Sequence, residues 1–168
     1  VLFAASEVAP IVKTGGLGDV TAALPAALRA LNVDARILIP GYAQALQALD
    51  TVPVTGSLEV LPGLPPVEIL ESRMPQSDVP IYLVHCPELY AREGGPYQHP
   101  DGTDWRDNDL RFGVLSRVAA WLGTRASPLQ WQPDIVHSND WQTGLTPAYV
   151  HFAPDRTAGT VQSIHNMA

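Results

Sequence analysis

The chain has very little cysteine and no long apolar run. Cys86 is its single cysteine, which excludes an internal disulfide framework and favours a reducing, cytoplasmic location. No uninterrupted apolar stretch approaches the roughly 20 residues of a membrane-spanning helix, and no basic segment precedes the apolar start as in a secretory signal. We therefore expect a protein that does not span a membrane.

Basic residues are also scarce. The chain has 10 Lys and Arg against 17 Asp and Glu, a net charge of -7, which repels nucleic acid and anionic membrane surfaces at long range. We expect neither as a partner. An anionic ligand must instead be held by local positive charge and by backbone amides. With 46% hydrophobic residues, the 168-residue chain is able to bury the core of one domain.

The order of the predicted elements indicates an α/β fold. Short apolar strands alternate with amphipathic helices, which is typical of a doubly wound, mostly parallel, Rossmann-like sheet. Pro25 lies within the first helical pattern, so we expect that helix to kink or to start late. The predicted strands cover residues 1–5, 34–40, 80–85, 133–137 and 159–164. The predicted helices cover 19–31, 110–122 and 141–152, and residues 41–50 are expected to form a turn that leads into a short helix.

Two stretches interrupt this alternation. Residues 51–80 contain short β-rich pieces separated by prolines, which favours hairpins or edge strands. Residues 87–109 are polar and lack periodicity, and loops this long are usually functional or disordered. Trp105 in this loop is a candidate for stacking on a sugar.

The sequence begins without Met and ends just after a predicted strand, so we expect residues 1–168 to be one domain of a longer protein.

The most informative segment follows the first predicted strand and opens the first helix. It reads Lys13-Thr14-Gly15-Gly16-Leu17-Gly18-Asp19. Glycines allow an anion to approach backbone amides at a helix start, and a lysine adds positive charge. The lysine precedes the glycines, which excludes a Walker loop, and the G-x-G-x-x-G spacing is absent. The alternative is a simple tight turn with a solvated lysine.

Polar side chains follow several predicted strands. Because ligands bind beyond the carboxyl ends of parallel strands, we expect these residues to gather at one edge of the sheet. Capping of the following helix is the alternative for Asn139 or Asp140. No pair has the spacing of a zinc site, and no G-x-S-x-G elbow is present, so we expect neither a metal nor serine hydrolysis. The strand-end residues are His85, Cys86, Glu88, Tyr90, His137, Ser138, Asn139, Asp140, His165 and Asn166.

These motifs resemble those of the bacterial glycogen synthases and plant starch synthases. The similar segments occur in the family's order over nearly the whole chain, and the lysine-glycine segment is the most specific of them. They are residues 13–20 with 24–28, 96–97 with 107–112, 133–137 with 140–145, and 164–166.

The resemblance implies the amino-terminal, acceptor-side half of a GT-B glycosyltransferase, whose carboxyl-terminal donor-binding domain is not part of residues 1–168. It places Asp140 and His165 at the reaction centre and assigns Lys13 to the donor phosphates. Main-chain contacts fall on Gly15, Gly16 and Leu17, and further substrate contacts on Asp19, Tyr97 and Asn166. Ser138 and Asn139 replace a common Ala-His pair.

The resemblance further implies transfer of glucose from a nucleotide-glucose donor, such as ADP-glucose, to the nonreducing end of an α-1,4-glucan, with retention of configuration. It implies no metal or other cofactor. The isolated domain is expected to be inactive. Two alternatives stay open: another GT-B glycosyltransferase with a different donor or acceptor, and a non-catalytic module that binds glucan or nucleotide.

Overall fold

One seven-stranded sheet organises the chain, in the order β3-β4-β5-β2-β1-β6-β7. A computed structural model describes residues 1–166. The strands are β1 (Leu2–Ala4), β2 (Arg36–Pro40), β3 (Val52–Pro53), β4 (Glu68–Arg73), β5 (Pro80–His85), β6 (Ile135–Asn139) and β7 (Gly159–Ser163). The helices are α1 (Gly16–Ala30), α2 (Ala43–Ala48), α3 (Pro87–Tyr90), α4 (Asn108–Leu122), the 3₁₀ turn η1 (Trp141–Thr143) and α5 (Thr146–Phe152).

Five neighbouring strands are parallel, from β5 through β2, β1 and β6 to β7. The remaining two, β3 and β4, form an antiparallel edge beside β5. This confirms the doubly wound, mostly parallel sheet and the edge strands expected between residues 51 and 80. The central strands are apolar on both faces, and Ile37, Leu38 and Ile39 of β2 are fully buried, as a sheet covered on both sides requires.

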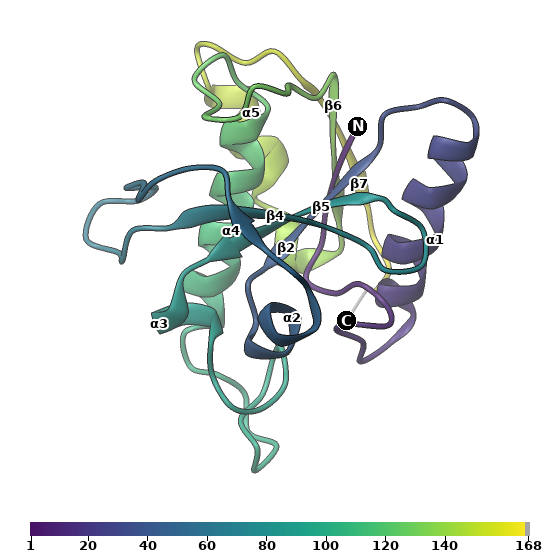
Figure 1. Ribbon diagram of the computed structural model, residues 1–168. Helices are drawn as coiled ribbons and strands as arrows, with labels where there is room; N and C mark the ends of the chain where they lie inside the picture. The colour runs from purple at the N-terminus through teal and green to yellow at the C-terminus, as the bar shows by residue number, and fades with distance from the viewer. Residues whose placement is uncertain (167–168) are drawn as a thin grey trace.

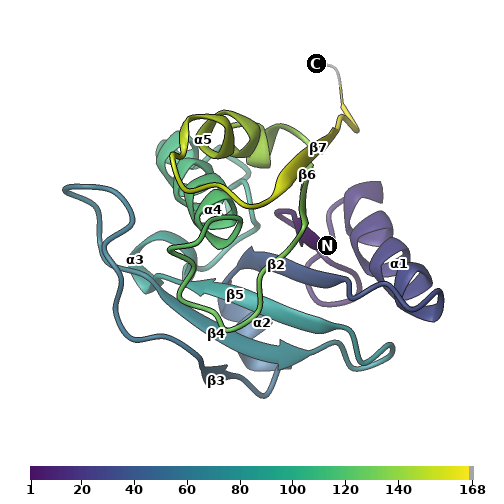
Figure 2. The same cartoon turned by 90° about the horizontal axis from the view of Figure 1, so that it is seen from above.

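Helices cover the two faces of the sheet. α1 lies on one face, and α4 with α5 lies on the other (Figures 1 and 2). α4 packs on β1 and β2, and α5 packs on α4 and β7. The carboxyl ends of the parallel strands point to the lower edge of Figure 1, where the loop after β1 and the long loop after α3 also lie.

Three element boundaries differ from the prediction. α1 begins at Gly16, because its first turn forms within the glycine segment itself. It then continues through Pro25 as one helix. The single helix expected over residues 141–152 is divided into η1 and α5, separated by Gly144 and Leu145. The polar stretch from residue 87 begins with the short helix α3, where Pro87 occupies the favourable first position.

Candidate functional site

The order of the strands places the topological switch point beside β1, where doubly wound folds have their ligand crevice. The chain passes from β1 to β2 on one side and later returns to β6 on the other. Loops that leave two such adjacent parallel strands diverge, and the space between them is where doubly wound folds bind ligands. The loop after β1 carries Lys13 and the glycines, and the loop after β6 begins with Asp140. The two groups predicted from the sequence therefore flank the same switch point.

The loop after β1 folds back on itself before α1 begins. Val8 and Val12 exchange backbone hydrogen bonds of 2.9 and 2.8 Å, and the Ala9 N–H donates to the Gly18 carbonyl at 2.9 Å. A side chain at Gly18 would place its Cβ 3.3 Å from the Val12 oxygen. Gly18 thus permits close packing of the loop against the start of the helix.

Gly15 and Gly16 have no such packing role. Both are exposed, and a Cβ added at either residue would meet no atom within 4 Å. The first four N–H groups of a helix have no partner within that helix, so the amides of Gly16 and Leu17 are directed outward from the start of α1. Glycine at these two positions leaves room for a ligand to approach the main chain.

A buried carboxylate that was given no role in the sequence analysis holds this loop. Glu7 is 2% exposed. Its Oε2 accepts the N–H groups of Thr14 at 2.6 Å and Gly15 at 3.2 Å, and its Oε1 accepts the Thr14 hydroxyl at 2.7 Å. Hydrogen bonds to a charged acceptor are about twice as strong as neutral ones. Glu7 therefore fixes the backbone just before α1.

Lys13 lies at the exposed mouth of the loop. Its Nζ is 2.7 Å from Oδ1 of Asp19, and both side chains are about half exposed. Asp19 belongs to the first turn of α1, where negative charge is favourable. Exposed ion pairs of this kind contribute roughly 0–1 kcal/mol to stability. A phosphate group of a ligand can therefore replace Asp19 beside the Lys13 ammonium at a small cost in free energy.

Asp140 has a strained backbone and a buried side chain. Its φ is 63° and its ψ is -175°, a region that is essentially restricted to glycine, and the residue is only 1% exposed. The carboxylate does not cap η1. It accepts the side-chain amide of Asn166 at 2.8 Å and the Asn166 N–H at 3.3 Å. Non-glycine residues hold such conformations mainly at functional sites.

His165 is adjacent in sequence to Asn166, which holds this carboxylate, and it is oriented by Asn139. Its Nε2 is 3.3 Å from Oδ1 of Asn139, whose amide donates to the carbonyls of Ala4 at 3.3 Å and His137 at 3.1 Å. Asn139 therefore connects the ends of β1 and β6 to the imidazole. Burial and the nearby His165 lower the pKa of His137, which is 2.7 Å from the Ser163 hydroxyl, so that its neutral form is favoured.

Tyr97 reaches the glycine loop from the long loop after α3. Its hydroxyl donates to Oε1 of Glu7 at 2.5 Å and lies 2.8 Å from the Ser6 hydroxyl. Burial and the adjacent Glu7 raise the pKa of the phenol well above its usual range. The Tyr97 ring packs near Phe112 and the exposed Trp141, which follows Asp140 directly. Tyr97 thus lies between the two groups of candidate residues.

Other strand-end residues lie apart from this site. His85 contacts Glu68 of β4 at 3.3 Å, and Cys86 is fully buried, which raises the pKa of its thiol. Trp105 packs against Arg92 and His99 of its own loop and against Arg111 of α4. Within residues 1–166, no three His, Cys, Asp or Glu side chains come together in a way that holds a metal ion.

The structure thus brings together Asp140, His165 and Asn166, and it places Lys13, Asp19, the glycines and Tyr97 around the neighbouring loop. Sequence reasoning gave no role to Glu7, Ser6 or the orienting amide of Asn139. The one available signal for Glu7 was an acidic residue between an apolar strand and Val8, a position where burial is expected.

No helix within the described part of the chain is both long and apolar enough to cross a membrane.

Comparisons with known proteins show the family of the chain. The family model described as "Starch synthase catalytic domain" matches residues 1–168. The glycogen synthase of Nitrosomonas europaea is 51% identical over 171 residues, and that of Paramagnetospirillum magneticum is 54% identical over 170 residues. In both cases the match includes 100% of this chain and 34% of the relative, so the chain spans about a third of the length of these curated relatives.

A solved structure is also similar. The catalytic domain of starch synthase IV from Arabidopsis thaliana, bound to ADP and acarbose, superposes with a TM-score of 0.79 at 28% identity. The match covers 98% of this chain and 33% of that one. From the full-length family match and the shared architecture, we conclude that the chain belongs to the starch synthase catalytic domain family.

Proposed function

We propose that residues 1–168 form the acceptor-side, amino-terminal domain of a retaining GT-B glucosyltransferase. Its donor is a nucleotide-glucose such as ADP-glucose, and its acceptor is the nonreducing end of an α-1,4-glucan. The observation that carries the proposal is the strained, buried Asp140, which lies with His165 across the switch point from an open glycine loop. The relatives named glycogen synthase and the neighbour bound to ADP and acarbose support the same assignment.

The chemistry requires charge stabilisation at two places. As the bond from glucose C1 to the diphosphate breaks, negative charge develops on the departing nucleotide and positive charge on the sugar ring. Lys13 and the amides of Gly16 and Leu17 are suited to the leaving diphosphate. Asp140, held by Asn166, and the oriented His165 are suited to the glucosyl group. As the bond from C1 to the diphosphate breaks, the acceptor hydroxyl oxygen bonds to C1, and the hydroxyl proton passes to the departing diphosphate.

A carboxyl-terminal domain of the same protein completes the donor site in this proposal. The exposed position of Lys13, Gly15 and Gly16 supports it, because within residues 1–166 no second wall faces them. We also propose a cytoplasmic location, supported by the single, buried cysteine Cys86.

The test uses the full-length protein that contains this chain. Labelled ADP-glucose and UDP-glucose are each supplied with glycogen, and incorporation into polymer is measured. We expect transfer from at least one donor, preferentially ADP-glucose, and an α-linkage in the product by NMR. Asp140→Asn should lower kcat by about 100-fold or more, and Lys13→Ala should raise KM for the donor. Binding of glucan or nucleotide without turnover would identify a non-catalytic module, and transfer to another acceptor would identify a different GT-B enzyme.

A further inference from the structure

Glu7 fills an anion site that the loop would otherwise offer to a ligand. Consecutive N–H groups just before a helix attract anions, and those of Thr14 and Gly15 are occupied by the Glu7 carboxylate. A donor phosphate is therefore left with the following amides, Gly16 and Leu17, and with Lys13. The position of those groups depends on the position of the carboxylate.

Tyr97 holds Glu7 from a segment ninety residues away in the sequence. The Tyr97 hydroxyl donates to Oε1 of Glu7, and its carbonyl accepts the side-chain amide of Asn108 at 3.0 Å and the N–H of Trp105 at 3.0 Å. Both ends of this residue are thus fixed, one on the glycine loop and the other at the start of α4.

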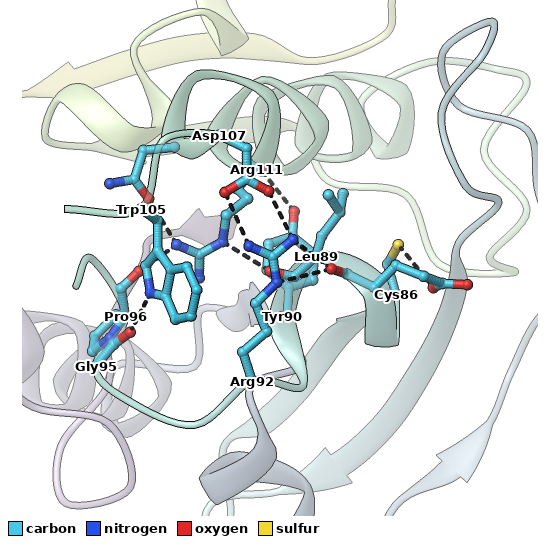
Figure 3. Close-up of polar contacts among 11 residues, drawn as sticks. Cys86, Leu89, Tyr90, Arg92, Gly95, Pro96, Trp105, Asp107 and Arg111 are labelled. Atoms are coloured by element: carbon cyan, nitrogen blue, oxygen red, sulfur yellow. Dashed lines mark hydrogen bonds and ion pairs between the residues drawn. The ribbon is translucent and has the colours of Figure 1, made fainter. Parts of the chain in front are cut away.

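Arg111 of α4 completes the chain of contacts. Figure 3 shows its guanidinium among the residues of the long loop, and it is only 1% exposed. Its Nη1 donates to the Pro96 carbonyl at 2.9 Å and to Oδ1 of Asn108 at 2.7 Å, and its Nε donates to the Leu89 carbonyl at 2.8 Å. No carboxylate within residues 1–166 forms an ion pair with Arg111. Its hydrogen bonds therefore go to the loop.

Arg92, near the start of the same loop, contacts residues near its end. Its guanidinium forms two hydrogen bonds to the Asp107 carboxylate, at 2.9 and 2.7 Å, and lies over the Trp105 ring (Figure 3). The Trp105 indole N–H donates to the Gly95 carbonyl at 3.2 Å. Hydrogen bonds therefore hold the loop on both sides of Tyr97.

We infer that Glu7 is a positioning residue for donor binding, and that Tyr97, fixed by Asn108 and Arg111, sets the position of Glu7. The long loop and the glycine loop then act as one unit, although they are far apart in sequence. This inference rests on the proposed function, since it assigns to Glu7 the task of presenting Lys13 and the amides of Gly16 and Leu17 to the donor diphosphate.

A double-mutant cycle in the full-length protein tests the inference. Glu7→Gln replaces an acceptor oxygen by a donor, and Tyr97→Phe removes the hydroxyl alone. Each change should lower kcat/KM for ADP-glucose by about 10- to 100-fold, because a hydrogen bond to a buried charge is lost, while KM for glycogen changes much less. Because both act through the same contact, the loss in the double variant should fall well below the product of the single losses.

Hydrogen exchange gives a readout that does not depend on activity. In both single variants, the peptide that contains Thr14 and Gly15 should exchange faster than in the wild type. Glu68→Gln and Tyr149→Phe are matched controls away from the crevice and should leave both measurements within about twofold of the wild type. If Glu7→Gln does not fold, Tyr97→Phe carries the exchange test alone.

The two possible failures are distinguishable. Multiplicative losses in the double variant, or unchanged exchange at the glycine loop, would overturn the positioning role even in an active enzyme. Absence of glucosyl transfer in the wild type would instead overturn the proposed function, and the exchange experiment would still decide whether Glu7 and Tyr97 hold the loop.

Discussion

At the scale of single residues, two glycines of the same loop have opposite reasons to be glycine. Gly18 is buried, and a Cβ there would press on backbone atoms of Val12 and Ala9. Gly16 is exposed, and a Cβ there would meet nothing. Gly18 therefore serves the fold. Gly16 serves the fold in no evident way, so its lack of a side chain points to a ligand.

Alanine substitution separates these two reasons. Gly16→Ala should leave the free energy of unfolding unchanged or raise it by up to about 1 kcal/mol, because the unfolded chain loses freedom, yet it should lower kcat/KM for the donor. Gly18→Ala should destabilise the protein by about 1 kcal/mol or more through overpacking. Thermal unfolding and steady-state kinetics on both variants check this. Equal stability of the two variants would contradict the packing argument.

The residues at the strand ends were predictable because their positions follow from the topology. Asp140 and His165 come within two residues of the end of a parallel strand, and Lys13 lies in the loop that follows another; such ends meet at one edge. Glu7 and Asn139 acquire their roles only when distant segments close upon them. Glu7 needs Tyr97, and Asn139 needs the β1 carbonyl of Ala4. The residues next to Glu7 and Asn139 in the sequence do not indicate these distant partners.

At the scale of elements, the long loop of residues 91–107 is held by polar contacts more than by an apolar core. Most of its residues are exposed, while Arg111 of α4 reaches toward it and donates hydrogen bonds from Nη1 to Pro96 and Asn108 and from Nε to Leu89. The Tyr90 hydroxyl in turn donates to the Arg111 carbonyl at 2.6 Å. Burial lowers the pKa of the Arg111 guanidinium, and the carbonyls of Leu89 and Pro96 accept its hydrogen bonds in place of water.

Replacement of this arginine should loosen the loop. Arg111→Met leaves the carbonyls of Leu89 and Pro96 without their donor, and we expect a loss of about 3 kcal/mol in the free energy of unfolding. Arg111→Lys should recover part of that loss, since one ammonium reaches fewer carbonyls. Arg106→Ala, on the exposed surface of the same loop, should change stability by about 0.5 kcal/mol or less. Denaturant unfolding measures all three, and wild-type stability of Arg111→Met would refute this role.

The pattern of apolar residues predicted the parallel strands as continuous runs and most helices by their spacing, because it reflects which residues are buried. It failed where a turn interrupts an apolar stretch. Residues 141–152 have helical spacing, but Gly144 and Leu145 divide them into η1 and α5. Pro25 was expected to disturb α1, and the helix nevertheless continues through it because packing on the sheet outweighs one lost hydrogen bond.

At the scale of the whole molecule, residues 1–166 provide one wall of the proposed donor site. Trp141, Lys13 and His165 are all exposed at the carboxyl edge of the sheet. In a cleft between two domains, such side chains would face the donor and the second wall. Electrostatic stabilisation of a reaction needs water to be excluded from the site, and one open wall does not exclude it.

We therefore expect residues 1–168, expressed alone and shown to be folded by circular dichroism, to incorporate no detectable label from ADP-glucose into glycogen. The full-length protein assayed in parallel is the positive control. Incorporation by the isolated domain above background would contradict the proposal that the donor site is shared between two domains.

The backbone at Asp140 has a consequence for engineering. A residue with φ near +63° and ψ near 180° is best served by glycine, and an aspartate held there costs about 1–3 kcal/mol. Any redesign that ranks substitutions by thermostability alone will favour Asp140→Gly, and in doing so it will delete the group proposed to act on the sugar. A substitution of Asp140 that raises thermostability is therefore expected to lower kcat.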